Sequence, residues 1–209
     1  MATTLADLRT ALRHRLRVPS GDALTDETLL TGLVNEALSA VASEADWPWL
    51  EVHSTTHVTE GGGAWNLPAD FGRLIVARFT GQQALERMPI ETLDRLDDAV
   101  GSPRFYAFFG SQLIWRPILV YAGDLWVRYK ILEATLTGDD DPPKIPERYK
   151  AAVVEMAAVL AHRRNGDHDK AAAAQDEYDR WLARMRRDAG LVSDSEGGGI
   201  VPAPPMPVK

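Results

Sequence analysis

Two kinds of side chain in this sequence have the chemistry to bind a metal ion or transfer a proton: clustered carboxylates and histidines. Asp139, Asp140 and Asp141 are consecutive carboxylates, the ligand type that a hard cation such as Ca²⁺ prefers. A calcium loop spaces its oxygen ligands regularly around a glycine, whereas Pro142 and Pro143 follow these three residues at once. The spacing therefore favours a solvated interdomain loop over a metal site.

Four of the five histidines form two pairs, and neither pair has the spacing of a metal site. His53 and His57 share one face of an expected strand, where they lie about 13 Å apart, too far to hold one ion together. His162 and His168 flank an expected turn at residues 165–166 and are able to approach one another. They lack a carboxylate partner at zinc-site spacing. We expect no bound metal.

Common catalytic motifs are missing from the sequence. The run Gly61–Gly63 is not followed by Lys-Ser or Lys-Thr, and no GxGxxG segment opens a helix, so no phosphate-binding loop is indicated. There is no cysteine and no G-x-S-x-G elbow. We therefore expect no catalytic residue and no cofactor, with an enzyme site assembled from scattered residues as the alternative.

Composition and charge narrow the class of protein. The 209 residues are 45% hydrophobic and 25% charged, with a net charge of −7, which argues against a protein that grips nucleic acid over a broad surface. The same charge suits a conduit through which nucleic acid slides, and ordinary solubility also explains it. No apolar run approaches the roughly 18 residues of a membrane span, and the N-terminus lacks the apolar block of a signal peptide.

Helical periodicity marks both ends of the chain. A first helix is predicted by leucines at helical spacing: Leu5, Leu8, Leu12 and Leu16. Beside them, Arg9, Arg13 and Arg17 form a basic stripe. We interpret this stripe as a solvated or subunit-contacting edge, with DNA contact as the alternative. A second helix is expected from an N-cap at Thr25 to about Asp46, because Pro48 disfavours helical backbone before it. Two more helices are expected after Pro146 and Asp167.

The middle of the chain changes to the period of strands. Alternation and β-branched residues predict strands at 50–59, 74–80, 83–88 (returning across a turn at Gly81), 105–109, 112–116 and 124–132, with a short helix within 89–100. Gly110-Ser111 is a candidate hairpin turn. The expected fold is thus α+β: residues 1–48 and 144–189 form one helical bundle, residues 49–143 an inserted, mostly antiparallel β-domain, and residues 190–209 an extended arm.

Aromatic residues mark two further positions. Trp47 and Trp49 fall where the second helix meets the β-domain, and we interpret them as the joint between the two, with ligand binding as the alternative. Four aromatics crowd one expected strand, so at least one strand face must be covered by the helices or by another subunit: Phe105, Tyr106, Phe108 and Phe109.

The segment GLVSDSEGGGIVPAPPMPVK at residues 190–209 combines a flexible glycine backbone, a stiff proline-rich backbone and apolar side chains. Gly197–Gly199 are flexible, and the four prolines that follow favour extended polyproline backbone. The segment suits an arm that orders on a partner surface, with a frayed terminus as the alternative. The predicted partner-binding residues are Ile200, Val201, Pro202, Pro204, Pro205, Met206 and Val208.

The order of several segments resembles the head-to-tail adaptor, or connector, proteins of tailed bacteriophages. The resemblance covers about Leu5 to Ala189. The segments that carry it are NEAL (35–38), DWPWLE (46–51), LPADFGRL (67–74), SPRFYAFFGSQLIWRP (102–117), VRYK (127–130) and IPERYKAAVVEMAA (145–158).

This resemblance implies a structural role in the virion, at the head–tail interface or neck, after assembly in the host cytoplasm. It implies a ring, typically a dodecamer, that docks beneath the portal and extends the DNA channel. Genomic DNA would pass through without sequence-specific binding, and stopper or tail-completion proteins would dock below. The C-terminal arm would reach the portal or a neighbouring subunit. Another neck or tail-completion protein, or a binding module built on the aromatic strands, remains as an alternative.

Overall fold

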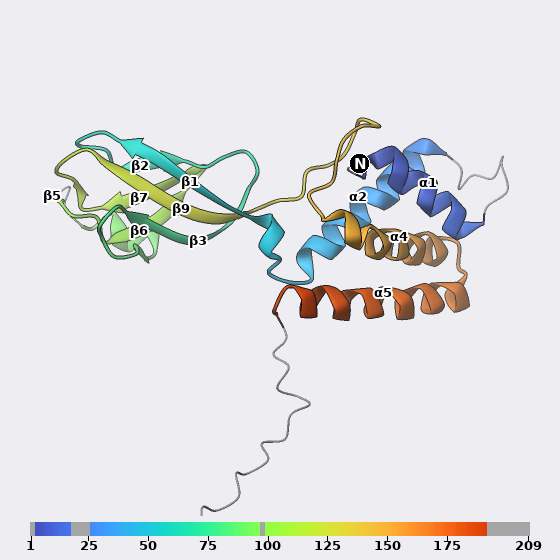
Figure 1. The fold of residues 1–209 in the computed structure, drawn as a ribbon. Coiled ribbons are helices and arrows are strands. Elements are labelled where there is room, and N and C mark those ends of the chain that lie inside the picture. Colours follow the sequence, from blue (N-terminus) through green and yellow to red (C-terminus); the bar gives the residue numbers. More distant parts are fainter. Residues whose placement is uncertain (1–2, 18–25, 97–98, 192–209) are drawn as a thin grey trace, which may run out of the picture. The chain divides into compact units, whose positions relative to one another are not determined.

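The computed structural model describes residues 3–17, 26–96 and 99–191. The chain forms two compact units, which we call the helical unit and the β unit. The helical unit comprises Met1–Asp46, Thr137–Pro142 and Pro146–Lys209, and the β unit comprises Trp47–Leu136 and Pro143–Ile145. The predicted α+β class, with helices towards both ends and strands between, is confirmed (Figure 1). The division differs from the expected one in placing residues 137–142 with the helices.

Helix α4 is the centre of the helical unit, since it contacts each of the other three long helices. These are α1 (Leu5–Leu16), α2 (Glu27–Ser43), α4 (Lys150–Arg164) and α5 (His168–Asp188). Helix α4 follows a single turn of 3-10 helix, η3 (Glu147–Tyr149), and runs beside α5 (Figure 1). Small side chains allow this close approach, because α4 buries several alanines: Ala152, Ala157, Ala158 and Ala161.

The ends of these helices are set by identifiable local contacts. Thr4 and Asp7 form a reciprocal capping box at the start of α1. Asp26 caps α2 by accepting the N–H of Thr28 at 2.9 Å, while the predicted cap Thr25 lies outside the described residues. Helix α2 ends at Ser43, before the expected Asp46. At the end of α5, Gly190 adopts a positive φ of 66° that closes the last turn.

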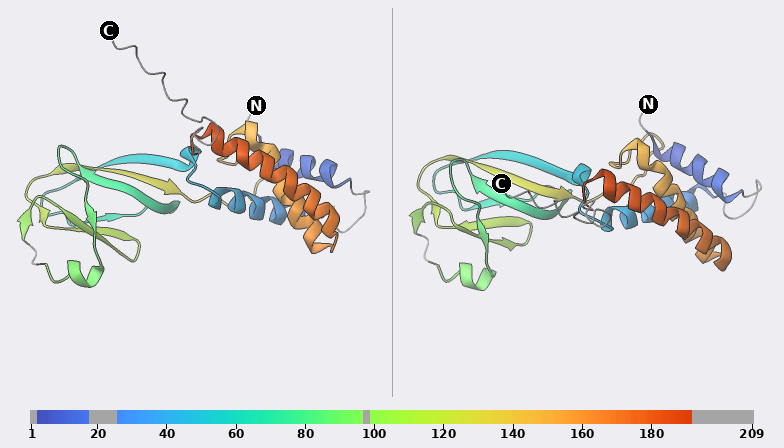
Figure 2. Two further views of the ribbon diagram at one scale, coloured as in Figure 1. Left: turned by 90° about the horizontal axis from the view of Figure 1, so that it is seen from below. Right: turned by 60° about the horizontal axis from the view of Figure 1, so that its bottom comes forward.

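The β unit contains two main sheets, which form two layers (Figure 2). The first has the order β1-β9-β3 and is antiparallel; its strands are β1 (Glu51–Val58), β9 (Gly123–Ile131) and β3 (Phe71–Phe79). The second has the order β2-β7-β6-β4; its strands are β2 (Ala64–Asn66), β7 (Gln112–Arg116), β6 (Phe105–Phe109) and β4 (Glu86–Arg87). Two short strands, β5 (Val100–Gly101) and β8 (Ile118–Leu119), pair separately.

Aromatic side chains fill the space between the two main sheets. Trp115 of β7 is fully buried and meets the ring of Phe79 of β3 edge-on, with the ring centroids 5.3 Å apart. Its indole Nε1 donates to the carbonyl of Gly62 at 3.1 Å. Trp65 of β2 and Tyr129 of β9 make a second contact between the sheets, at 6.3 Å. These rings supply the largest apolar surfaces of the β unit's core.

Two predictions about the middle of the chain are wrong. The return strand expected at 83–88 shrinks to one antiparallel bridge, Arg78 to Ala84, and the chain then crosses to the other sheet, where β4 pairs in parallel with β6. The helix expected within 89–100 is only the single turn α3 (Ile90–Leu93). Leu93 is buried there but Leu96 is 36% exposed, so the apolar spacing does not extend a buried face.

Candidate partner-binding surfaces

The aspartate run, Asp139–Asp141, is exposed at Asp139 and Asp140, as predicted for a solvated loop, and its backbone also caps helix α1. The carbonyls of Asp139 and Asp141 accept the N–H groups of Ala6 and Leu5 at 3.1 and 3.0 Å. The first N–H groups of a helix have no partner within the helix, so these carbonyls satisfy donors that would otherwise be lost. The run therefore has a structural role in the helical unit.

The arginines of α1 are also committed to contacts within the unit. The side chain of Arg9 is only 11% exposed, and its Nη2 donates to Asp139 Oδ1 at 2.6 Å. Its Nε lies 3.1 Å from Glu27 Oε2; the two groups form an ion pair, but their geometry is not that of a hydrogen bond. Arg13 pairs with Glu27 as well. Arg9 thus ties α1 to α2 and to the aspartate run, which contradicts its placement on a solvated or DNA-contacting edge.

Removal of the Asp141 carboxylate should loosen the start of α1. Its Oδ2 accepts the N–H groups of Gly138 and Thr137 at 2.7 and 2.8 Å, which hold its pKa below the ordinary value of 3.8. We expect Asp141→Ala to speed amide hydrogen exchange at Leu5 and Ala6 several-fold at neutral pH.

The pH dependence of this effect has a definite sign. A carboxyl whose pKa is lowered by folding stabilises the fold above its unfolded pKa, and that stability is lost as the pH falls through the folded pKa. The difference between the Asp141→Ala variant and the natural chain should therefore shrink as the pH falls below the ordinary carboxyl pKa of 3.8 and through the lowered pKa of the folded state. The matched control is Asp140→Ala, which should leave the exchange of these amides unchanged. Equal effects of both substitutions would contradict the assigned role.

The histidines do not converge on a common site. His53 and His57 lie on the exposed side of β1, and His57 Nδ1 is 2.8 Å from Asp124 Oδ1. His162 is buried, and burial lowers its pKa, while His168 is exposed at the first turn of α5. Within the described residues, no group of three or more His, Cys, Asp or Glu side chains could hold a metal ion.

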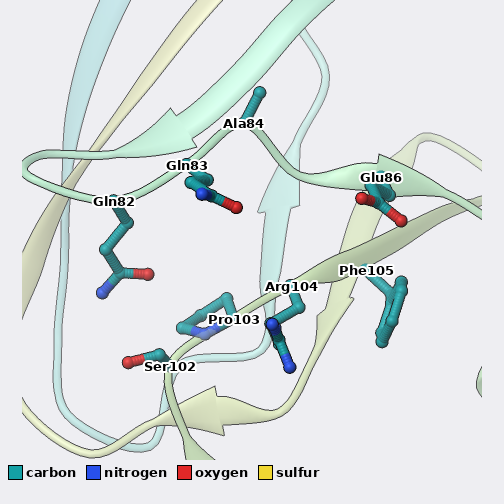
Figure 3. Close-up of a pocket in the computed structure, with 8 residues that line it drawn as sticks. All are labelled: Gln82, Gln83, Ala84, Glu86, Ser102, Pro103, Arg104 and Phe105. Carbon is teal, nitrogen blue, oxygen red and sulfur yellow. The ribbon is translucent and has the colours of Figure 1, made fainter.

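A polar pocket of about 320 Å³ lies between the β4 edge and the segment leading into β6 (Figure 3). Amide, hydroxyl, carboxylate and guanidinium groups surround it, and Gln82 reaches towards Ser102 across the opening. The lining residues are Gln82, Gln83, Ala84, Glu86, Ser102, Pro103, Arg104 and Phe105. The lining groups, of mixed charge, do not form a nucleophile–base pair, so the pocket suits weak polar contact more than catalysis.

An apolar groove lies at the other end of β4, where the chain leads into α3. It has a volume of about 500 Å³ and is lined by Arg87, Met88, Pro89, Ile90, Ala107 and Phe108. The ring of Phe108 is half-buried and lies 5.8 Å from Phe71 and 5.7 Å from Tyr106, measured between ring centroids. Of the four aromatics predicted to crowd this strand, Phe108 faces this groove and Phe109 is 65% exposed. Sequence reasoning noted the aromatics but missed the groove's other wall.

The two tryptophans at the start of the β unit stack on each other. Trp47 is fully buried, and its ring lies 4.6 Å from that of Trp49 with an angle of 15° between the planes. Pro48 opens a short 3-10 turn, η2 (Pro48–Leu50), that holds the two rings side by side. The role of this pair as a joint between the units stays a prediction.

The sequence of the chain matches the model of a known protein family. A family model described as the SU10 adaptor protein matches residues 3–199, nearly the whole chain. The chain belongs to the SU10 adaptor family. The resemblance to phage head-to-tail adaptor proteins is thereby confirmed, and the chain is a structural phage adaptor and a virion component. Comparison with curated proteins returns no match.

Membership of the SU10 adaptor family does not test the predicted role of the arm residues in partner binding. The matched segment ends at residue 199, before the predicted partner-binding residues at 200–208. Those residues also lie outside the part of the chain that the structure describes. In the described part, none of the helices of this SU10 adaptor combines the length and apolar character needed to cross a membrane.

Proposed function

We propose that this SU10 adaptor forms a ring, a dodecamer by analogy with phage adaptors, beneath the portal of the DNA-filled head. The ring extends the DNA channel and presents a docking surface for stopper or tail-completion proteins. It assembles in the host cytoplasm and stays in the neck of the virion. The family match over residues 3–199 is the observation that carries this proposal.

Exposed apolar side chains on the β unit support an assembled state. Four large ones are 60% exposed or more: Val100, Phe109, Tyr121 and Leu132. Single exposed apolar residues are ordinary, but aromatic groups of this size are commonly covered by a partner in assemblies. These residues are therefore the first candidates for contacts between subunits or with a tail protein.

The net charge of −7 supports the proposed channel. A surface that lines a DNA path must not hold the phosphates tightly, because phosphate contacts by Lys and Arg dominate nucleic-acid affinity. Several arginines of the helical unit already pair with carboxylates of the same unit: Arg9, Arg13, Arg15, Arg164 and Arg186. Passage of genomic DNA without sequence-specific binding is consistent with this charge distribution.

Electron microscopy of the purified chain mixed with its portal tests the ring directly. We expect ring-shaped complexes with the adaptor stacked on the portal. Chains that stay monomeric and do not associate with portal would contradict the proposal. A chain that binds only to preformed adaptor rings would instead identify a different neck protein.

Deletion of Gly197–Lys209 should leave a folded protein that joins heads to tails poorly. We propose that the arm binds the portal or a neighbouring subunit through its apolar and proline residues, so its loss removes an attachment and not a core. We expect the yield of infectious particles to fall by at least tenfold, with the thermal unfolding midpoint unchanged. A Gly-Ser arm of equal length separates the loss of apolar contact from the loss of length. Full assembly by the deleted chain would contradict the arm's role.

A further inference from the structure

The apolar groove beside β4 has the chemistry of a site for extended, proline-rich peptides. Such peptides bind aromatic-lined grooves because their polyproline backbone is already ordered, so little conformational entropy is lost on binding. Phe108 provides an aromatic platform, and its contacts with Phe71 and Tyr106 restrict the orientation of its ring. Met88 and Ile90 form the facing aliphatic wall.

The backbone beside the groove adds hydrogen-bonding groups. The ladder between β4 and β6 ends where the N–H of Met88 donates to the carbonyl of Tyr106 at 2.9 Å. The next donor in register would be the N–H of Ile90, but the chain turns at Pro89 into α3 and leaves the ladder there. Successive residues of a strand direct their backbone groups to alternate sides, so the N–H and C=O of Phe108 point to the same side as those of Tyr106, beyond the end of the ladder. Proline carbonyls can accept such an N–H.

Charge makes one rim of the groove selective. The guanidinium of the exposed Arg87 lies 5.7 Å from the centroid of the Phe108 ring. A ligand for this groove would thus combine apolar and proline residues with a nearby carboxylate. The polar pocket at the other end of β4 offers no such match, because it carries the carboxylate of Glu86 and a mostly polar lining.

The chain itself contains a segment with this combination. Residues 200–208 read IVPAPPMPV, and the acidic residues Asp194 and Glu196 precede them. The prolines favour the extended backbone that the groove suits, and the apolar residues supply side chains for its wall. The carboxylates complement Arg87.

We infer that residues 194–208 of one copy bind in the Arg87–Phe108 groove of a second copy. The inference rests on the proposed ring, which brings copies side by side, and it selects the neighbouring subunit as the arm's partner. Exchange of an arm around a ring would link each subunit to the next without any change in the folded units. The groove and the arm together form a heterologous contact, the type that closes into a ring.

Photo-crosslinking in the full-length chain tests this inference. We would place p-benzoylphenylalanine at position 206 in place of Met206 and irradiate the assembled protein. We expect a crosslinked product of twice the subunit mass, with peptides joined at residues 87–90 or 106–108. Mixing ¹⁵N-labelled with unlabelled chains distinguishes a link between two copies from a link within one.

Two matched substitutions give the test its control. Ile90→Asp places a carboxylate on the apolar wall and opposes the acidic arm, so we expect the crosslink yield to fall at least fivefold. Thr55→Asp introduces the same carboxylate at an exposed residue of β1 that lies outside the groove lining. It should leave the yield unchanged. Equal yields from both variants, crosslinks to other surfaces, or links only within one copy would overturn the inference.

The outcomes also separate this inference from the proposed ring. Rings seen by electron microscopy without crosslinks to the groove would leave the ring in place and overturn the groove assignment. Crosslinks between copies at the groove without a ring on the portal would support the groove and contradict the proposed function.

Discussion

Replacement of Trp115 by alanine should lower the free energy of unfolding of the β unit by about 4 kcal/mol. The side chain is fully buried between the two main sheets, so its removal leaves a cavity that the sheets cannot fill without moving. Its Nε1 also donates to the carbonyl of Gly62 at 3.1 Å, and the substitution leaves that carbonyl with only the longer bond from the N–H of Leu119, at 3.5 Å. Urea denaturation, monitored through hydrogen exchange at the amides of β7 and β9, measures the change in the free energy of unfolding.

Trp126 provides the matched control for this prediction. It lies in β9 of the same unit but is only half-buried, with the guanidinium of Arg78 4.7 Å from its ring centroid. Trp126→Ala loses that cation–π contact and part of the ring's burial, so we expect a cost of about 1 kcal/mol. Similar costs for the two tryptophans would show that Trp115 does not form the core of the β unit.

Sequence patterns predicted the long helices well because the relevant information is local. Leu5, Leu8 and Leu12 repeat at helical spacing, and all three are buried on α1. The turn between the last two helices was predictable from Asn165-Gly166, since Gly166 adopts a positive φ of 76° that most residues avoid. The hairpin at Gly110-Ser111 is confirmed for the same reason, with Gly110 at a φ of 57°.

Contacts between distant residues were not predictable in this way. The aspartate run at 139–141 caps a helix that begins at residue 5, and nothing in either segment identifies the other as its partner. Likewise, β4 pairs in parallel with β6 across an intervening helix, a pairing that no local turn signal marks. Periodicity reports which face of an element is buried, but not which element covers it.

The candidate groove illustrates the same limit for function. Its aromatic wall was visible in the sequence as Phe105–Phe109. Its aliphatic wall, Met88 and Ile90, was assigned in part to a strand and in part to a helix that the structure shortens. The groove exists because the chain leaves β4 at Pro89 and turns into α3, which ends the ladder early. The arm, in contrast, was recognised from composition alone.

Replacement of Ala174 by phenylalanine should disrupt the helical unit by overpacking. Ala174 is fully buried on α5, which runs against α4, where half of the buried positions are alanines. Interiors are packed at nearly crystalline density, so a ring has no space there unless the two helices separate. We expect a loss of about 3 kcal/mol in the free energy of unfolding, measured by urea denaturation followed by circular dichroism at a helical wavelength.

Ala173, the preceding residue, gives the control because it is exposed on the same helix. Ala173→Phe has the same change in volume and helix propensity, so the difference between the variants isolates packing against the rest of the unit. We expect this control to stay within about 0.5 kcal/mol of the natural chain. In the proposed ring, the packing of α5 against α4 through buried alanines holds the end of α5 in place, and the arm begins there at Gly190. Ala174→Phe should therefore reduce ring assembly together with stability, whereas Ala173→Phe should reduce assembly only if that face of α5 contacts a neighbour.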